Sequence, residues 1–134
     1  MLSDLATSIG AFAAYFGVAL ALTVTFVFIY MQTTPHKEFA LIRDGNGAAA
    51  LGLAGAVLGF VLPLALVISV SHAISEALIW GAIALIVQVA GHWLARLLFP
   101  KLNADIAAGK YAAAIVQAAF AIVLGLLQAA CWTP

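Results

Sequence analysis

Residues 33–50 read Thr-Thr-Pro-His-Lys-Glu-Phe-Ala-Leu-Ile-Arg-Asp-Gly-Asn-Gly-Ala-Ala-Ala and form the longest polar interruption in an otherwise apolar chain. Thr34 can cap a short helix that starts at Pro35, where the backbone N–H would have no partner in any case. Gly45 can end that helix in a left-handed conformation, and Asn46 can cap the helix that follows. The stretch therefore predicts a corner between two helices, which we call the first elbow.

Apolar and polar side chains are mixed within the first elbow. Its polar members include His36, Lys37, Glu38 and Arg43, and they are interspersed with apolar residues such as Phe39. A short segment with this mixture can lie along a membrane surface. We therefore expect its charges to lie in water and its apolar groups in lipid.

The composition identifies a membrane protein. The chain has 134 residues, of which 66% are hydrophobic and 7% are charged, whereas a typical soluble domain carries about 25% charged residues. A helix of about 20 apolar residues crosses the hydrocarbon layer, and four continuous runs without strand-like alternation reach that length. The predicted spans are 8–32, 47–71, 75–99 and 110–132. The sequence thus predicts an all-α integral membrane protein with one domain, residues 1–134.

A weaker copy of the first elbow follows about 64 residues later, at residues 100–114. It reads Pro-Lys-Leu-Asn-Ala-Asp-Ile-Ala-Ala-Gly-Lys-Tyr-Ala-Ala-Ala, and we call it the second elbow. Gly45 aligns with Gly109, and an alanine run follows each. Because each unit is a helix, an elbow and a helix, the two units form a parallel repeat about an axis along the membrane normal. The predicted repeats cover about 8–71 and 75–132.

All five basic residues fall on one side of the predicted membrane, in or beside the two elbows. They are Lys37, Arg43, Arg96, Lys101 and Lys110. The positive-inside rule therefore places both elbows in the cytoplasm and both termini on the outer side of the membrane, and tyrosines and tryptophans near the span ends agree. The first run has no preceding Lys or Arg, and its apolar core is longer than that of a secretory signal, so we expect it to be retained.

Small residues indicate close helix packing, either within the chain or between subunits. They are Ala13, Gly17 and Ala21 in the first span, Gly52, Gly55 and Gly59 in the second, and Gly125 in the fourth. Pro63 frees the carbonyl of Gly59 and predicts a kink, which is either simple geometry or a hinge or binding notch. A bundle this rich in Ala and Gly is thin, so we expect a homo-oligomer.

Polar residues in the third span form a candidate path. Gln88, His92 and Arg96 recur every four residues and share one helix face. Polar groups at that depth must face protein or water, which makes the stripe a candidate proton or ion path. The alternative is structural: Gln88 and His92 join helices, and Arg96 reaches the headgroups. Gln117 and Gln128 in the fourth span predict amide hydrogen bonds between helices.

The outer turn carries a second candidate site, His72 with Glu76. Ser75 can cap the third helix, and a carboxylate in the first turn of that helix is favoured by the helix dipole. The alternative is an outer-mouth carboxylate paired with His72.

Other classes of function find no support in the sequence. The formal net charge is zero, so nucleic acid has no electrostatic attraction to the chain. Cys131 is the only cysteine, and the three histidines lie at different depths, so we expect neither a disulfide within the chain nor a metal site. No catalytic constellation, phosphate loop or cofactor motif appears. We therefore expect no enzyme activity and no cofactor.

The chain resembles the domain-of-unknown-function 350 family of small bacterial inner-membrane proteins over essentially its whole length. The first elbow carries most of this resemblance, together with Gly-Phe-Val-Leu-Pro-Leu-Ala at 59–65, Ile-Trp-Gly at 79–81 and Ala-Gly-Lys-Tyr-Ala-Ala-Ala-Ile at 108–115. The resemblance implies a four-helix inner-membrane protein of two tandem units and supplies no catalytic or binding residues. It also implies a link to envelope-stress and polyamine-related gene neighbourhoods.

Two classes of function remain, and in both the lipid bilayer surrounds the protein. The first is a non-enzymatic module that oligomerises and offers its cytoplasmic elbows to a cytoplasmic or membrane protein partner or to anionic lipid headgroups. The second is a small channel or transporter for protons or ions that uses Gln88, His92 and Arg96, with the Gly59–Pro63 kink as its gate.

Overall fold

The computed structural model describes residues 1–33 and 37–132. Within them lie α1 (Leu2–Thr33), α2 (Glu38–Arg43), α3 (Gly47–Val70), α4 (Ile74–Leu98), α5 (Leu102–Ala107) and α6 (Tyr111–Cys131). The described residues contain no strand. Four of these helices, α1, α3, α4 and α6, are long and apolar enough to cross a membrane. The predicted all-α class with four transmembrane helices is confirmed.

Most helix ends lie within one residue of the predicted span ends, but α1 starts much earlier than expected. It begins at Leu2 and not at residue 8, so residues 2–7, which lie outside the predicted span, are helical as well. Asp4 lies in its first turn, where the helix dipole favours a carboxylate, and the Thr7 hydroxyl donates to the Ser3 carbonyl at 2.9 Å. The 32 residues of α1 extend roughly 48 Å, which exceeds the hydrocarbon thickness of about 30 Å.

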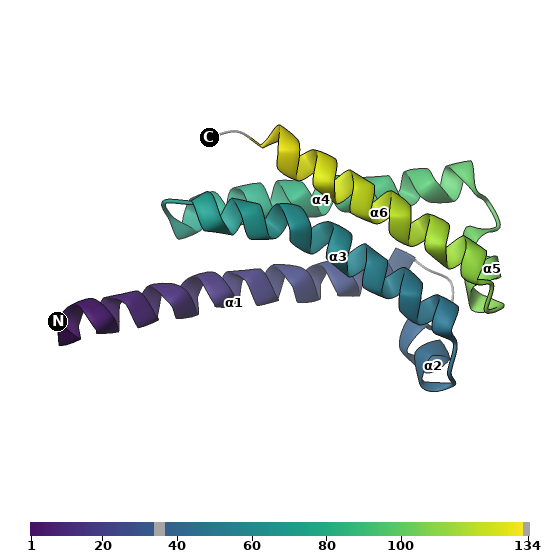
Figure 1. Cartoon of the computed structure of the whole chain (residues 1–134), viewed down its shortest axis with the longest axis horizontal. Helices are drawn as coiled ribbons and strands as arrows, with labels where there is room; N and C mark the ends of the chain where they lie inside the picture. Colours follow the sequence, from purple (N-terminus) through teal and green to yellow (C-terminus); the bar gives the residue numbers. More distant parts are fainter. Residues whose placement is uncertain (34–36, 133–134) are drawn as a thin grey trace.

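The centre of the molecule is the pair α3 and α6, which pack against each other along most of their length. α4 contacts both of them, and α1 contacts α3 and α4. Figure 1 shows that α1 diverges from the other helices toward its N-terminus, whereas α2 and α5 lie at the same end of the bundle. The bundle therefore presents both elbows at one end, as a parallel repeat requires.

Glycines allow the backbones of α3 and α6 to touch. A Cβ atom added to Gly55 would lie 2.3 Å from Ala118 Cβ, and one added to Gly125 would lie 2.0 Å from the Gly59 carbonyl oxygen. Real Cβ atoms do not approach other atoms this closely. The glycines of α3 and α6 are therefore used for packing within the chain, which removes them as evidence for packing between subunits.

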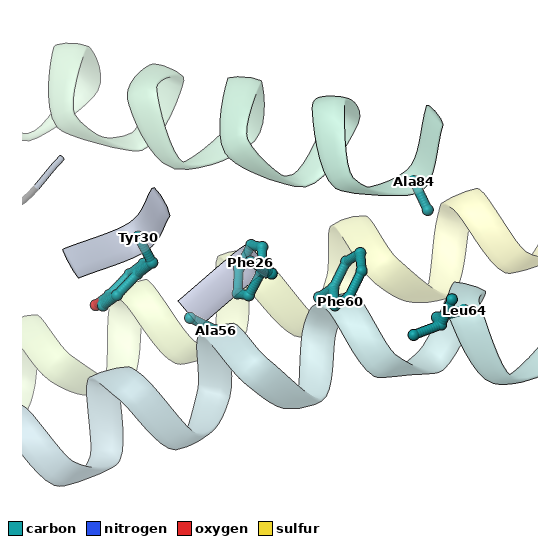
Figure 2. Packing of buried hydrophobic residues seen from close by; sticks show 6 residues of the cluster. All are labelled: Phe26, Tyr30, Ala56, Phe60, Leu64 and Ala84. Carbon is teal, nitrogen blue, oxygen red and sulfur yellow. The ribbon is translucent and has the colours of Figure 1, made fainter. Parts of the chain in front are cut away.

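An apolar row fills the space between α1, α3 and α4. Figure 2 shows this row running from Tyr30 past Phe26 and Phe60 to Leu64. The rings of Phe26 and Phe60 stack with their centroids 4.8 Å apart, and both side chains are almost completely buried. Aromatic pairs of this kind add to the stability gained from burial alone, so this row fixes the C-terminal half of α1 to the bundle.

Candidate functional site

Polar side chains from three helices meet inside the bundle, and we call them the polar cluster. The cluster consists of Tyr30 of α1, Gln88 and His92 of α4, and Gln117 and Gln128 of α6. Gln117 donates a hydrogen bond to the Tyr30 hydroxyl, and Gln128 Nε2 donates to Gln88 Oε1 at 2.6 Å. Gln88 Nε2 donates in turn to the Ala121 carbonyl at 2.9 Å. These bonds hold α1 and α4 to α6, which is how buried amides ordinarily stabilise membrane helices.

The polar cluster surrounds a small cavity. Its volume is about 20 Å³, and its walls include Tyr30, Gln88, His92 and Gln117. The rings of Tyr30 and His92 lie 4.7 Å apart between centroids. Gln117 Oε1 is buried and accepts no hydrogen bond from the described residues. The cavity has room for about one water molecule with polar partners, and it is too small for a hydrated ion.

Arg96 is separated from the other two members of the predicted stripe. Its guanidinium donates a hydrogen bond to the carbonyl of Thr33, the last residue of α1, and lies 4.6 Å from the centroid of the Trp93 ring. The last turn of α1 has no basic residue of its own, and a cation there is favoured by the helix dipole. Of the stripe, only Gln88 and His92 therefore line this small cavity, while Arg96 stabilises the C-terminal end of α1.

The first elbow differs from the sequence prediction at Glu38. We expected its charge in water, but its side chain is only 1% exposed. Position 38 corresponds in the repeat to Leu102, which is 3% exposed, so the same face of each short helix turns inward. The Glu38 side chain therefore belongs to the interior at the elbow end of the bundle.

Other residues of the first elbow agree with the expectation that charged and apolar side chains are both exposed, the former to water and the latter to lipid. Lys37 and Arg43 are exposed, and Phe39 is 46% exposed. α2 begins at Glu38, and Lys37 takes the N-cap position without a capping hydrogen bond from its side chain. The predicted cap at Thr34, the helix start at Pro35 and the elbow residue His36 lie outside the described residues.

The two short helices end in the same way, as the aligned glycines predict. Gly45 has φ +88° and Gly109 has φ +83°, both in the left-handed region. In each case the glycine N–H and the next residue's N–H bond back to carbonyls of the last helical turn. This pair of bonds is the Schellman motif, which satisfies carbonyls that a helix end otherwise leaves unpaired.

Asn46 joins the two elbows. Its Oδ1 accepts a hydrogen bond from the Ala49 N–H at 3.0 Å, which confirms the predicted cap of α3. Its Nδ2 donates to the carbonyls of Ile106 and Ala107 at 3.2 and 3.1 Å, at the end of α5. One side chain therefore caps the start of α3 and the end of α5, and it fixes the elbows beside each other.

The joined elbows form a surface with exposed basic side chains, which we call the elbow surface. Its basic residues are Lys37, Arg43, Lys101 and Lys110, all of them exposed. Lys110 Nζ lies 3.4 Å from Asp105 Oδ1. Phe39 of the first elbow and Phe99, which directly precedes the second elbow, are also exposed. The elbow surface thus combines cationic and aromatic groups, as segments at a membrane interface do.

The outer turn also differs from the expectation. The N-cap position of α4 is taken by Ala73, so Ser75 is a first-turn residue and the predicted Ser75 cap is wrong. Glu76 Oε2 accepts a hydrogen bond from the His72 backbone N–H at 3.2 Å. A carboxylate at this position can reach back and satisfy an N–H ahead of the helix, which replaces the serine cap. The contact between Glu76 and His72 is made by the backbone of His72.

A pocket of about 200 Å³ lies toward the other end of the bundle from the elbows, between α3, α4 and α6. Its walls include Pro63, Trp80, Gln128 and Trp132, and the two tryptophan rings meet edge to face with centroids 6.1 Å apart. Cys131 also lines the pocket and is exposed. Pro63 lies inside α3, which continues through it. Gln128 therefore links this outer pocket to Gln88 and the polar cluster.

These features define an all-helical integral membrane protein with two joined elbows at one end and a small polar cluster inside its bundle. The chain belongs to the family described as Domain of Unknown Function (DUF350), whose model matches residues 4–132. It is similar to the UPF0719 inner membrane protein YjfL of Escherichia coli (strain K12), with 37% identity over 126 residues that cover 94% of this chain and 96% of the relative.

A more distant relative is the UPF0719 transmembrane protein YshE of Bacillus subtilis (strain 168), with 26% identity over 93 residues and 69% of each chain covered. No solved structure matches the chain. The family that the elbow residues indicate is thereby confirmed.

Proposed function

We propose that this protein is a non-enzymatic module of the bacterial inner membrane that acts through its elbow surface. The elbows face the cytoplasm and contact anionic lipid headgroups or a protein partner, and the termini face the periplasm. The observation that carries this proposal is the pair of hydrogen bonds from Asn46 to the end of α5. Because they join the elbows, the four exposed basic residues act as one surface. The inner-membrane name of the similar Escherichia coli protein supports the location.

Self-association through the outer half of α1 is part of this proposal. A Cβ atom added to Gly10 or Gly17 would meet nothing within 4 Å, in contrast to the glycines of α3 and α6. Phe12 and Phe16 are exposed on the same half, with their rings stacked 5.5 Å apart. Small residues allow close helix approach in lipid, and the glycines of α1 are still available for a second copy of the chain.

Charge reversal in the first elbow tests the proposal. Lys37→Glu combined with Arg43→Glu changes the local charge by four units and places carboxylates where cations attract anionic lipid, each worth about 1 kcal/mol near such a surface. We expect the double variant to lose cytoplasmic proteins that cross-link to the wild type in intact cells, or to lose its preference for phosphatidylglycerol over phosphatidylcholine. Quantitative mass spectrometry of purified protein, with its cross-linked partners and bound lipids, measures both.

The matched control is Lys37→Arg with Arg43→Lys, which keeps both charges and should behave as the wild type. If the charge-reversed protein folds, retains its cross-linked partners and retains the same lipids, then the elbow surface does not carry the function.

A specific observation also favours a second candidate, a narrow path for protons. The outer pocket, the Gln128–Gln88 hydrogen bond and the central cavity follow one another along the bundle. Buried Glu38 and Tyr30 continue the series toward the elbows. Ionisable groups inside membrane proteins often mark such paths. The size of the central cavity favours protons over hydrated ions.

A further inference from the structure

A groove opens at the elbow end of the bundle, between the end of α4, the short helix α5 and the first turns of α6. Its volume is about 460 Å³, which lies within the range of small-molecule and cofactor sites, roughly 300–1,000 Å³. Leu98 and Phe99 line it at the end of α4, and Ala112 and Val116 line it from α6. Ala112 is exposed and has a small side chain.

The groove combines apolar side chains with two charged residues. Its walls are mostly apolar, and Leu98 is 60% exposed. Lys101 and Asp105 contribute its charged groups. Asp105 is paired with Lys110 at 3.4 Å, whereas Lys101 forms no ion pair within the described part of the chain. The groove therefore combines an apolar surface with one cation, Lys101, that is not engaged in an ion pair within the described residues.

We propose that this groove binds an anionic phospholipid, with one acyl chain along Leu98, Ala112 and Val116 and the phosphate beside Lys101. This inference rests on the proposed contact between the elbow surface and lipid headgroups, and it names the site and the lipid class. Leu98 ends α4 and Tyr111 begins α6, so the groove lies where spans end and headgroups meet hydrocarbon. All the basic residues lie at this end of the molecule, which complements an anionic lipid surface.

Two pairs of variants separate binding in the groove from general attraction to the elbows. Lys101→Gln removes the cation at the groove, and Lys37→Gln makes the same change at the equivalent position of the first elbow. Ala112→Phe fills the groove from an exposed position, and Ala119→Phe places the same ring at an exposed position of α6 outside the groove. All four residues are exposed, so these changes leave the core intact.

The measurement is native mass spectrometry of the purified full-length protein with added phosphatidylglycerol or phosphatidylcholine. We expect the wild type to bind phosphatidylglycerol more tightly than phosphatidylcholine. Lys101→Gln should weaken phosphatidylglycerol binding about fivefold, the effect of one cation near an anionic headgroup, and Lys37→Gln should weaken it less than twofold. Ala112→Phe should abolish the tightest lipid adduct, and Ala119→Phe should keep it.

Two results would overturn the proposal, and they differ in what they say about the elbow surface. If Lys101→Gln and Lys37→Gln weaken phosphatidylglycerol binding equally and Ala112→Phe has no effect, the elbows attract anionic lipid but the groove is not the site. If the wild type binds both lipids equally and no variant changes the binding, the groove is not a lipid site and contact of the elbows with anionic headgroups also fails.

Discussion

Gly125→Val should destabilise the folded protein by about 1–3 kcal/mol, the usual cost of forcing extra atoms into a well-packed site. A Cβ atom at this position would lie 2.0 Å from the Gly59 carbonyl oxygen, and a backbone atom cannot move aside as a flexible side chain can. The helices α3 and α6 would have to separate along their contact. Unfolding of the purified protein in detergent, followed by circular dichroism against temperature or added SDS, measures the loss.

The matched control for this prediction is Gly17→Val in α1. A Cβ atom at Gly17 meets nothing within 4 Å of its own chain, so in the monomeric protein in detergent the same substitution should change the free energy of unfolding by less than about 0.5 kcal/mol, as surface changes usually do. Equal destabilisation by the two variants would mean that the glycine contact between α3 and α6 is not what holds the bundle together.

Asn46→Ala should destabilise the elbows by about 0.5–2 kcal/mol, the range for losing a helix cap. The substitution removes the cap of α3 and also the two hydrogen bonds to Ile106 and Ala107. Hydrogen–deuterium exchange measured peptide by peptide should therefore become faster both in the first turn of α3 and in α5. These two segments are distant in sequence, so faster exchange in both indicates that one side chain joins them.

Asn46→Asp separates the two contributions of Asn46. The carboxylate can still accept the Ala49 N–H, but it cannot donate, and it would face the two carbonyls at the end of α5. We expect exchange in the first turn of α3 to stay near the wild-type rate and exchange in α5 to become faster. If α5 exchanges at the wild-type rate in both variants, the elbows are not joined through Asn46.

The sequence was sufficient to predict the transmembrane helices because their signals are local. Apolar runs set the spans, and Gly45 and Asn46 place the corner within one or two residues. The start of α1 was not predictable from hydropathy, because Ser3 and Asp4 lower the local hydrophobicity without breaking a helix. The polar groups of Ser3 and Asp4 are instead compatible with the first turn of α1, where the helix dipole favours a negative charge.

The candidate site was predictable only in part because it depends on contacts between distant segments. The four-residue spacing placed Gln88 and His92 on one face, but Tyr30 reaches Gln117 across 87 positions of sequence. The burial of Glu38 was not predicted from the sequence, because a charged side chain is expected to lie in water. Its alignment with Leu102 in the repeat was an available signal, since equivalent positions of a repeat face the same way.

We proposed that this protein acts through its elbow surface, with a proton path through the polar cluster as the second candidate. Flux of protons and several cations in proteoliposomes of the purified, folded protein, with His92→Ala as the comparison, tests this claim directly. We expect no flux above empty liposomes at either sign of the membrane potential, for wild type and variant alike. Flux that the wild type supports and His92→Ala changes would contradict the claim and assign the polar cluster to a conduction path.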